Sequence, residues 1–328
     1  MKHQFQRIAG VLLLLGVVAP SIASGQLTKL RAAYSAESSW SLATWVAHDA
    51  GLFKKYGLDV DLVLIRSAST ITSALIAGEA PMIQLGGNGT IQAALQGADT
   101  VNVLTLIPLI PQSLVVTPDI KSADDLRGKR VGVSRFGALS DLVIRRYLRK
   151  LGLDPAKDVS IVQIGGIPEL VTAMKAGAIS GGSISPPALT VAKKLGFREL
   201  SDFESLDYKY PAVAIASTKS FILRNRSVAL NFIRGEIEGI HVIRTQKSLA
   251  INVLKKYMRI NDADILEDGY RYAFKFFQQR PYPILDEVKA VLDEYKSMPQ
   301  AASAKAEQFI DLSLLQELEK EKFFDKLK

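Results

Sequence analysis

Two segments of the chain, residues 27–85 and 126–184, follow one pattern at a constant separation of 99 positions. Each has a strand-like run that ends on serine, then a run that begins Asp-Val, then a segment that ends in glycine. The matched pieces are Leu27–Ser35 with Leu126–Ser134, Asp59–Ile65 with Asp158–Ile164, and Ser73–Gly78 with Thr172–Gly177. A repeat of this length is a lobe, because solenoid repeats are about 20–50 residues long. The sequence therefore predicts two similar lobes with a cleft between them.

Within each lobe, apolar runs with a strand-like period alternate with segments of helical period. In the first lobe, strands are predicted at residues 30–35, 58–64, 82–85 and 102–107, with helices at 41–56, 69–77 and 88–96. In the second lobe, strands are predicted at 130–134, 159–164 and 182–185, with helices at 140–151, 168–176 and 188–195. This alternation predicts an α/β fold with a parallel sheet in each of two similar Rossmann-like lobes.

Two further apolar runs, Ser113–Thr117 and Pro211–Ser217, are predicted to cross between the lobes as a two-strand hinge. Beyond Lys219 the periodicity is helical, and these helices are expected to pack on the first lobe. The predicted division is residues 26–112 and 217–328 for lobe 1 with the C-terminal helices, and residues 113–216 for lobe 2 with both crossings.

Residues 1–25 have the pattern of a secretory signal peptide that is removed on export. Lys2 and Arg7 flank the start of a short apolar run, Val11–Val18, and small residues follow at 21–25. The apolar run is shorter than the about 20 residues that span a bilayer, so an uncleaved anchor is the less favoured interpretation. The mature protein is therefore expected to be exported.

Composition excludes several classes of site. The chain has no cysteine, which excludes disulfides, thiolate metal sites and cysteine nucleophiles. Two histidines, His48 and His241, remain after the signal segment, so neither a metal centre nor a cofactor is expected. Lys and Arg (41) exceed Asp and Glu (33), giving a formal net charge of +8, but the two signs are interleaved. Without a clustered basic face or a recognisable motif, nucleic-acid binding is not expected.

The segments that follow the predicted strands are rich in serine, glycine and asparagine. In open parallel sheets, ligands bind beyond the carboxyl ends of the strands, where hydroxyl groups and free backbone N–H groups suit a small anion. Aromatic residues, among them Tyr210, could form flat apolar walls, and Arg66 and Arg135 are candidate counter-charges. The predicted ligand-binding residues are Ser35, Ser38, Ser39, Trp40, Ser67, Ser69, Gly87, Asn88, Gly89, Ser134, Arg135, Phe136, Gly137, Ser140, Gly166, Ser185, Pro186 and Tyr208.

Each of these residues also has a structural interpretation. Serine and asparagine at helix starts commonly act as N-caps, and glycine after a strand commonly forms a turn. Aromatic side chains commonly fill cores. The functional interpretation depends on convergence, since all six loops are expected to open on the same side.

No arrangement of residues in the sequence indicates catalysis. The stretch Gly86–Gly89 lacks the Gly-Lys-Ser/Thr of a Walker loop, and no G-x-S-x-G motif occurs. His48, beside Asp49, is interpreted as a surface histidine. We therefore expect a binding protein and not an enzyme.

Three stretches resemble the solute-binding proteins of bacterial ABC-type uptake transporters in the nitrate, sulfonate, taurine and thiamine-pyrimidine group. The most specific is Ala47–Leu62 (AHDAGLFKKYGLDVDL), which is similar to the family signature A-x-x-x-G-L-F-x-x-x-G-L-D-V. The others are Leu75–Gly78 with the strand after it, and Asp125–Phe136 (DLRGKRVGVSRF). The resemblance covers nearly the whole chain after the signal segment.

This resemblance implies a type II periplasmic binding protein that closes on a solute and delivers it to a membrane permease and its ATPase. A monomer in the periplasm is expected, with a small organic anion of the sulfonate or carboxylate type as ligand; the aromatics leave a heterocycle open. Two alternatives remain. One is a ligand-binding partner of a sensor or chemoreceptor. The other is an enzyme like the thiamine-pyrimidine synthases of the same superfamily, whose cysteine-rich iron motif this chain lacks.

Overall fold

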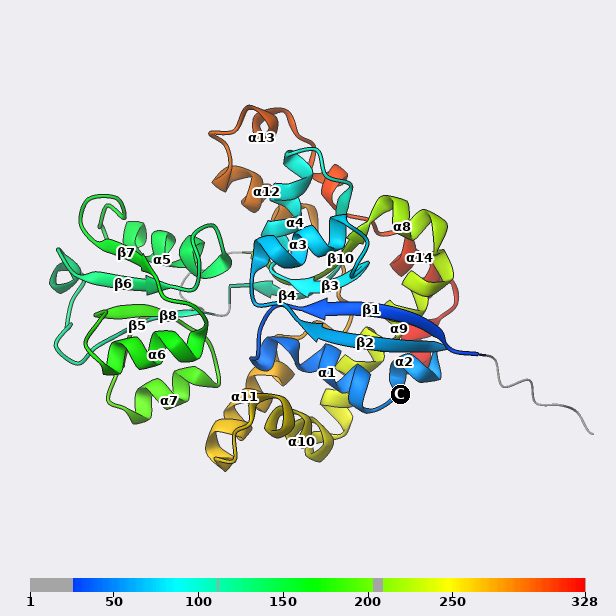
Figure 1. Ribbon diagram of the computed structural model, residues 1–328, viewed down its shortest axis with the longest axis horizontal. Coiled ribbons are helices and arrows are strands. Elements are labelled where there is room, and N and C mark those ends of the chain that lie inside the picture. The colour runs from blue at the N-terminus through cyan, green and yellow to red at the C-terminus, as the bar shows by residue number, and fades with distance from the viewer. Residues whose placement is uncertain (1–25, 111, 203–208, 328) are drawn as a thin grey trace, which may run out of the picture.

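Two α/β lobes, each built on one five-stranded sheet, lie side by side in the computed structural model (Figure 1). The structure describes residues 26–110, 112–202 and 209–327. The predicted signal peptide, residues 1–25, and the predicted site residue Tyr208 therefore lie outside the described residues. Within the described part of the chain, no helix combines the length and the apolar character needed to cross a membrane.

The sheet of lobe 1 has the strand order β2-β1-β3-β10-β4. Its strands are β1 (Thr28–Tyr34), β2 (Leu58–Leu64), β3 (Met82–Leu85), β4 (Thr100–Leu109) and β10 (Lys209–Thr218). Strands β1, β2 and β3 are parallel, and β10 pairs antiparallel with both β3 and β4. The five strands thus form a mixed sheet.

The sheet of lobe 2 has the equivalent order β7-β6-β8-β5-β9. Its strands are β5 (Ser113–Val116), β6 (Arg130–Val133), β7 (Ser160–Gln163), β8 (Gly181–Ile184) and β9 (Arg198–Ser201). Here β5 is the antiparallel strand, between β8 and β9. In both lobes, therefore, the antiparallel strand is the fourth in the sheet.

The repeat found in the sequence is confirmed by the structure, with the same offset of 99. Adding 99 to the residue bounds of helix α3 (Ala68–Ile76) gives the bounds of α6 (Ile167–Lys175). The bounds of β3 and β8 are related in the same way. The pairing register is repeated as well. Thr28 lies opposite Leu58 in β1–β2, and Arg130 lies opposite Ser160 in β6–β7, a separation of 30 positions in both cases.

Three expectations about the strands need correction. The sheets are mixed and not parallel, because each receives one antiparallel strand from a crossing of the chain. The return crossing at Pro211–Ser217 is part of β10 in the sheet of lobe 1, so these residues do not belong with residues 113–216 in lobe 2. Strand β9 was not predicted. Periodicity shows that a segment is a strand but carries no information about its pairing partner.

Helices of the repeated part cover the two sheets (Figure 1). In lobe 1 they are α1 (Leu42–Asp49), α2 (Leu52–Lys55), α3 and α4 (Gly87–Leu95), and in lobe 2 they are α5 (Leu139–Lys150), α6 and α7 (Ala188–Lys194). Short 3-10 turns precede α1 at Ser39–Ser41 (η1) and β6 at Asp124–Leu126 (η2). The single helix expected over 41–56 is divided at Gly51, which has φ +70°, a conformation that glycine adopts without strain.

The C-terminal third of the chain is helical, as the periodicity indicates. Its helices are α8 (Lys219–Arg224), α9 (Arg226–Thr245), α10 (Lys247–Met258), α11 (Ala263–Phe276), α12 (Leu285–Glu294), α13 (Pro299–Ser303), α14 (Ser313–Lys320) and α15 (Phe323–Lys326), with a 3-10 turn, η4, at Ala306–Phe309. They surround lobe 1 in Figure 1, and α9 packs on α1 and α2. Helix α11 also reaches lobe 2, where Thr190 Oγ1 donates to Asp268 Oδ2 at 2.7 Å.

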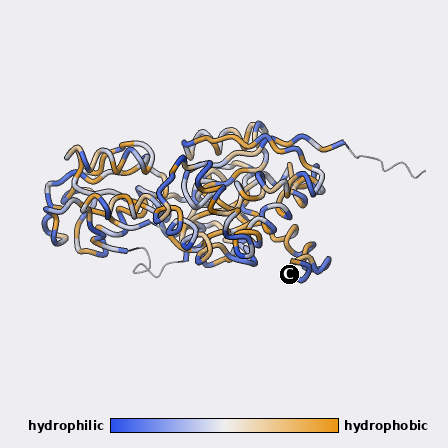
Figure 2. Tube along the Cα trace, turned by 90° about the horizontal axis from the view of Figure 1, so that it is seen from below, coloured by the Kyte–Doolittle hydropathy of each residue, from blue (hydrophilic) through white to orange (hydrophobic). Residues whose placement is uncertain are grey.

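Apolar side chains fill both lobes, and the hydrophobic stretches run through their interiors in Figure 2. The largest buried cluster includes residues of both lobes, so the lobes are packed together at their junction. On lobe 1, Trp45 stacks on Tyr257 with ring centroids 4.7 Å apart, which joins α10 to α1. Stacked aromatic pairs of this kind contribute about 0.5–1.5 kcal/mol beyond their buried area.

The close crossing of α9 and α1 depends on Gly239. A Cβ atom at this position would lie 2.6 Å from the Ala43 carbonyl oxygen, so the backbone would have to move. We expect Gly239→Ala to lower the free energy of unfolding by about 1–3 kcal/mol, in spite of the better helix propensity of alanine. Urea denaturation of the two proteins measures this difference.

Gly269 in α11 provides the matched control. A Cβ there would meet Leu254 and Pro187 at 3.5 Å, which is ordinary van der Waals contact. Gly269→Ala should therefore raise the free energy of unfolding by about 0.5–1 kcal/mol, the usual gain for alanine inside a helix. Equal effects of the two substitutions would contradict the packing argument.

Candidate functional site

A cleft of about 770 Å³ lies between the two lobes, and both lobes line it. Its walls come from the loops and helix starts that follow the strands β1, β2 and β3 of lobe 1 and β6 and β7 of lobe 2. These are carboxyl ends of parallel strands, where backbone N–H groups at helix starts are free to bind a ligand. The fold thus brings five strand ends to one cavity.

Most of the predicted site residues line this cleft. From lobe 1 these are Ser35, Ser38, Trp40, Ser69, Asn88 and Gly89, and from lobe 2 they are Ser134, Arg135, Phe136, Gly137, Ser140 and Gly166. The candidate counter-charge Arg66 also lines it. Residues more than 100 positions apart in the sequence, such as Ser35 and Gly166, therefore line the same cavity.

Five predicted residues do not line the cleft. Ser39 and Ser185 are fully buried, and Ser39 Oγ donates to the Pro186 carbonyl at 2.8 Å, so this pair of loops forms a contact between the lobes. The side chain of Ser67 caps α3 by accepting from the Thr70 N–H. A Cβ on Gly87 would lie 2.9 Å from the Pro211 side chain, so this glycine serves packing with β10. The expectation that all six loops open into the cleft is therefore wrong for the loop after β8.

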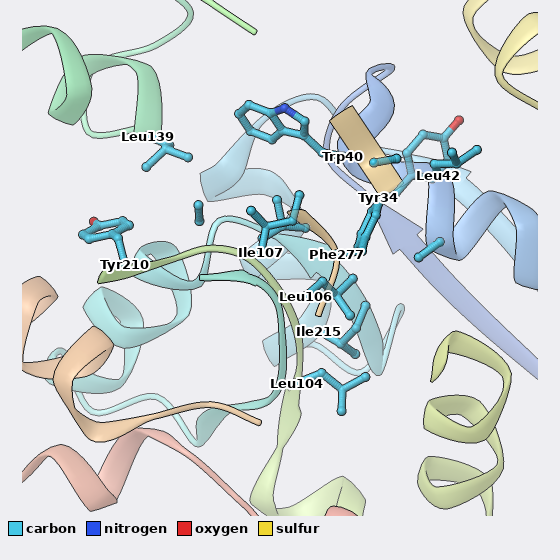
Figure 3. Packing of buried hydrophobic residues seen from close by; sticks show 14 of the residues in the cluster. Tyr34, Trp40, Leu42, Leu104, Leu106, Ile107, Leu139, Tyr210, Ile215 and Phe277 are labelled. Carbon is cyan, nitrogen blue, oxygen red and sulfur yellow. The ribbon is translucent and has the colours of Figure 1, made fainter. Parts of the chain in front are cut away.

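Trp40 forms an apolar part of the lobe 1 wall, and its exposed fraction is 7%. Figure 3 shows it at the edge of the buried cluster, with Leu139 of lobe 2 and Tyr210 nearby in the view. Gln84 holds its backbone in place, since Gln84 Nε2 donates to the Trp40 carbonyl at 3.2 Å. The indole N–H of Trp40 has no hydrogen-bond partner among the described residues. Tyr210 is fully buried in this core and does not line the cleft.

Thr72 adds a second unsatisfied group to the same wall. It lies on α3, its side chain is buried, and its Oγ1 has no partner within the part of the chain that the structure describes. A buried polar group without a hydrogen bond costs about 1–3 kcal/mol, which a ligand can recover by supplying the missing partner. Trp40 and Thr72 thus each place in the cleft wall one polar atom that has no partner among the described residues.

One part of the lobe 2 wall is the loop between β6 and α5. The hydroxyl groups of Ser134 and Ser140 are 2.6 Å apart, and the Ser134 N–H donates to Ser140 Oγ at 3.0 Å. Gly137 has φ +76° and its N–H donates to Asp141 Oδ2 at 2.9 Å. Phe136, which belongs to the same loop, has a solvent-exposed side chain, with an exposed fraction of 53%. An exposed aromatic ring beside a polar loop is suited to cover an apolar part of a ligand.

Two arginines line the cleft, and the structure distinguishes them. Arg66 is paired with Glu37, which raises the pKa of the guanidinium, and Glu169 of lobe 2 attracts it further. Arg135 has no carboxylate within ion-pair distance in the described ranges, and its side chain is exposed. Arg135 is therefore the available positive charge, whereas the charge of Arg66 is already balanced.

Several lining residues were not predicted from the sequence. They are Ala36, Glu37, Thr72, Ser73, Ile76, Gln92, Gln96, Gln112 and Glu169. A helical-face analysis would have found some of them, because they lie on the same face of a helix as a predicted residue. On α3 this face has the spacing i, i+3, i+4 and i+7 and consists of Ser69, Thr72, Ser73 and Ile76. Along α4 the spacing is i, i+4 and i+8, at Asn88, Gln92 and Gln96. Gln112 had no such signal, since it lies in the crossing between β4 and β5.

The site offers hydrogen-bond donors, one unpaired cation and two aromatic rings. Among the described residues there is no cluster of three or more histidine, cysteine, aspartate or glutamate side chains that could hold a metal ion. His48 does not line the cleft; it lies on α1, where its Nδ1 is 3.2 Å from Asp49 Oδ1 and 3.3 Å from the Tyr257 hydroxyl oxygen. The arrangement is suited to binding a small polar or anionic molecule.

Comparison with known proteins agrees with this architecture. The model of a family described as NMT1/THI5 like matches residues 41–246. A protein of Bacillus subtilis (strain 168) that is named as a binding protein, YtlA, is 22% identical over 285 residues, which are 84% of this chain and 85% of that protein.

Two solved structures are similar over most of their length. The periplasmic aliphatic sulphonate binding protein SsuA from Escherichia coli has a TM-score of 0.70 at 22% identity, covering 86% of this chain and 92% of that one. The periplasmic nitrate-binding protein NrtA from Synechocystis PCC 6803 has a TM-score of 0.74 at 15% identity, covering 90% and 89%. This likeness shows that the chain has the fold of periplasmic binding proteins.

Proposed function

This chain belongs to the NMT1/THI5-like family, and we propose that it is the extracytoplasmic solute-binding component of an ABC-type importer. The observation that carries the proposal is the cleft of about 770 Å³ lined by both lobes of the fold. A ligand held between two lobes contacts more of the protein when the lobes approach each other. It therefore binds the closed form better and shifts the population toward it.

The proposed ligand is a small organic anion of the sulfonate or carboxylate type. Arg135 supplies the balancing charge, and charge-assisted hydrogen bonds to a guanidinium are roughly twice as strong as neutral ones. The ligand is oriented by hydrogen bonds from the hydroxyl groups of Ser134 and Ser140 and from the indole N–H of Trp40, which has no partner among the described residues. The aromatic rings of Phe136 and Trp40 also line the cleft and are suited to contact the apolar part of an organic ligand, which favours an organic over an inorganic anion.

Capture without turnover is part of the proposal, because among the described residues that line the cleft no serine or threonine hydroxyl is hydrogen-bonded to a carboxylate or a histidine that could activate it. We further propose that a membrane permease and its ATPase receive the solute, and that the protein acts as a monomer in the periplasm. The relative YtlA is named as a binding protein, which agrees with this assignment.

A thermal-shift screen followed by scattering tests the proposal. The screen contains ethanesulfonate, benzenesulfonate, benzoate, nitrate and an uncharged pyrimidine, and a ligand that binds only the native state raises the melting temperature. We expect an organic anion to give the largest increase. Small-angle X-ray scattering at saturation should then show a smaller radius of gyration than the free protein.

The thermal-shift screen tests the class of ligand, and scattering tests the closure of the lobes. An increase in melting temperature with unchanged dimensions would contradict closure but keep the cleft as a binding site. A response to the pyrimidine alone would contradict the assignment of an anion. Chemical conversion of the bound compound, followed by NMR, would contradict capture without turnover.

A further inference from the structure

A second pocket lies on lobe 1 outside the cleft, between α9, the segment that joins α11 to α12, and α15. It has a volume of about 380 Å³, and its lining includes Ile237, Ile240, His241 and Arg244 of α9 together with Arg280 and Phe324. None of these residues lines the cleft between the lobes. We call it the rear pocket.

Arg244 is the guanidinium of this pocket that has no ion-pair partner in the part of the chain that the structure describes. Its Nη2 donates to the Phe277 carbonyl at 3.0 Å, and its guanidinium lies 4.8 Å from the ring centre of Phe274. No carboxylate among the described residues pairs with it, and its Nε is buried without a hydrogen-bond partner. Burial lowers the pKa of Arg244, which agrees with a cation that is partly desolvated and unpaired.

The second arginine of the rear pocket differs in its charge balance. Arg280 pairs with Glu319, and its Nη2 is 3.6 Å from Asp325. Its guanidinium lies 4.7 Å from the ring centre of Phe324, which places that ring beside the pocket. The pocket therefore combines one balanced and one unbalanced guanidinium with an apolar wall of Ile237, Ile240 and Phe324.

We propose that the rear pocket is a second binding site, for a short aliphatic carboxylate, with Arg244 as its counter-charge. The planar guanidinium matches a carboxylate through parallel N–H donors, and a partly desolvated, unpaired cation gains most from such a partner. The apolar wall receives the alkyl chain, and burying each CH₂ contributes about 0.8 kcal/mol. The site is independent of the function proposed for the cleft.

Hexanoate is the probe that tests this site, with hexanol as its uncharged match. Binding is measured by NMR titration of the full chain and of three variants, Arg244→Gln, Arg244→Lys and Arg135→Gln. Binding at the rear pocket is read from the methyl resonances of Ile237 and Ile240, and binding in the cleft from the ring resonances of Phe136. We expect Arg244→Gln to weaken binding at the rear pocket at least about tenfold and Arg244→Lys to weaken it less. Arg135→Gln should weaken only the hexanoate that binds in the cleft. Hexanol should bind more weakly than hexanoate.

The same experiment can overturn the proposal. A folded Arg244→Gln protein that binds hexanoate as well as the wild type would do so, as would equal binding of hexanol. Resonance shifts confined to the cleft, and abolished by Arg135→Gln alone, would contradict a rear-pocket site and would leave the proposed function of the cleft intact. If Arg244→Gln does not fold, the Nε–H resonance of Arg244 in the wild type decides, because hexanoate should shift it and hexanol should not.

Discussion

Replacing Arg135 with glutamine is expected to lower the affinity for the anionic ligand by about 10- to 100-fold. A hydrogen bond to a charged group contributes about 1.5–3 kcal/mol, and each 1.4 kcal/mol corresponds to a factor of ten. Arg135 lines the cleft and has no ion-pair partner in the described part of the chain, so its charge is available to a ligand. Because the side chain is exposed, the substitution should leave the melting temperature of the free protein nearly unchanged.

Arg66→Gln is the matched control, since it removes the same group from the opposite wall of the same cleft. The charge of Arg66 is already balanced by Glu37, so the loss of affinity should be less than about fivefold. Isothermal titration calorimetry with the anion that gives the largest thermal shift measures both values. A larger loss for Arg66→Gln than for Arg135→Gln would show that the two arginines have been assigned the wrong way round.

The second large effect concerns stability against pH and depends on Glu236 in α9. This carboxyl group is fully buried, and Thr44 Oγ1 donates to its Oε2 at 3.1 Å while Oε1 has no partner among the described residues. Burial raises the pKa of Glu236 to about 8, and the hydrogen bond from Thr44 offsets this only in part. The native protein therefore holds a proton on Glu236 that the unfolded chain releases near pH 4.5.

The direction of the pH effect follows from that difference. A group whose pKa is raised on folding contributes its full stability below the pKa of the unfolded chain, and this contribution is lost as the pH rises through the folded value. We expect the free energy of unfolding to fall between about pH 4.5 and 8 by up to roughly 4–5 kcal/mol on account of Glu236, at about 1.4 kcal/mol for each unit of pKa.

Glu236→Gln should remove this slope, because the amide is nearly isosteric with the protonated carboxyl group and does not titrate. Denaturant unfolding at pH 5, 6.5 and 8 would show the variant and the wild type close together at pH 5 and the variant more stable at pH 8. Glu307→Gln, at an exposed position, is the control and should follow the wild-type profile. Parallel profiles for Glu236→Gln and the wild type would rule out a buried, protonated Glu236.

A second buried carboxyl group sharpens this test. Glu287 in α12 is 1% exposed, and burial raises its pKa to about 7. Its contribution should be lost between about pH 4.5 and 7, so Glu287→Gln should flatten the lower part of the profile only. The two substitutions can thus be told apart by the pH range that each one affects.

The lobes could be predicted from the sequence because their signals are local. Within each copy of the repeat, the alternation of strand and helix depends on residues close together in the chain. Comparing the two copies then gives the offset of 99 positions, and α3 and α6 lie where this offset places them. The loops that carry Ser35 and Ser134 could be predicted for the same reason, since a strand end followed by a helix start is visible in a short stretch.

The pairing partners could not be predicted. Strand β10 reads as apolar whether it crosses a hinge or completes the sheet of lobe 1, and that choice depends on residues more than 100 positions away. Ser39 and Ser35 are equally plausible ligands in the sequence, yet only the packing of Ser39 against Pro186 removes it from the cleft. The sequence likewise does not distinguish Arg66 from Arg135. They differ in the structure because Glu37 forms an ion pair with Arg66.

Two α/β lobes, the helical C-terminal third and the loops in which we expect a ligand site could all be inferred from local patterns in the amino-acid sequence. Three features became visible once the chain was folded: which of those loops open into the cleft, which arginine keeps an available charge, and that Thr72 and Trp40 each have a polar atom there with no partner among the described residues. The physical reason is that periodicity records which side of an element is buried, whereas hydrogen bonds and ion pairs depend on which distant side chains the packing brings within about 3 Å.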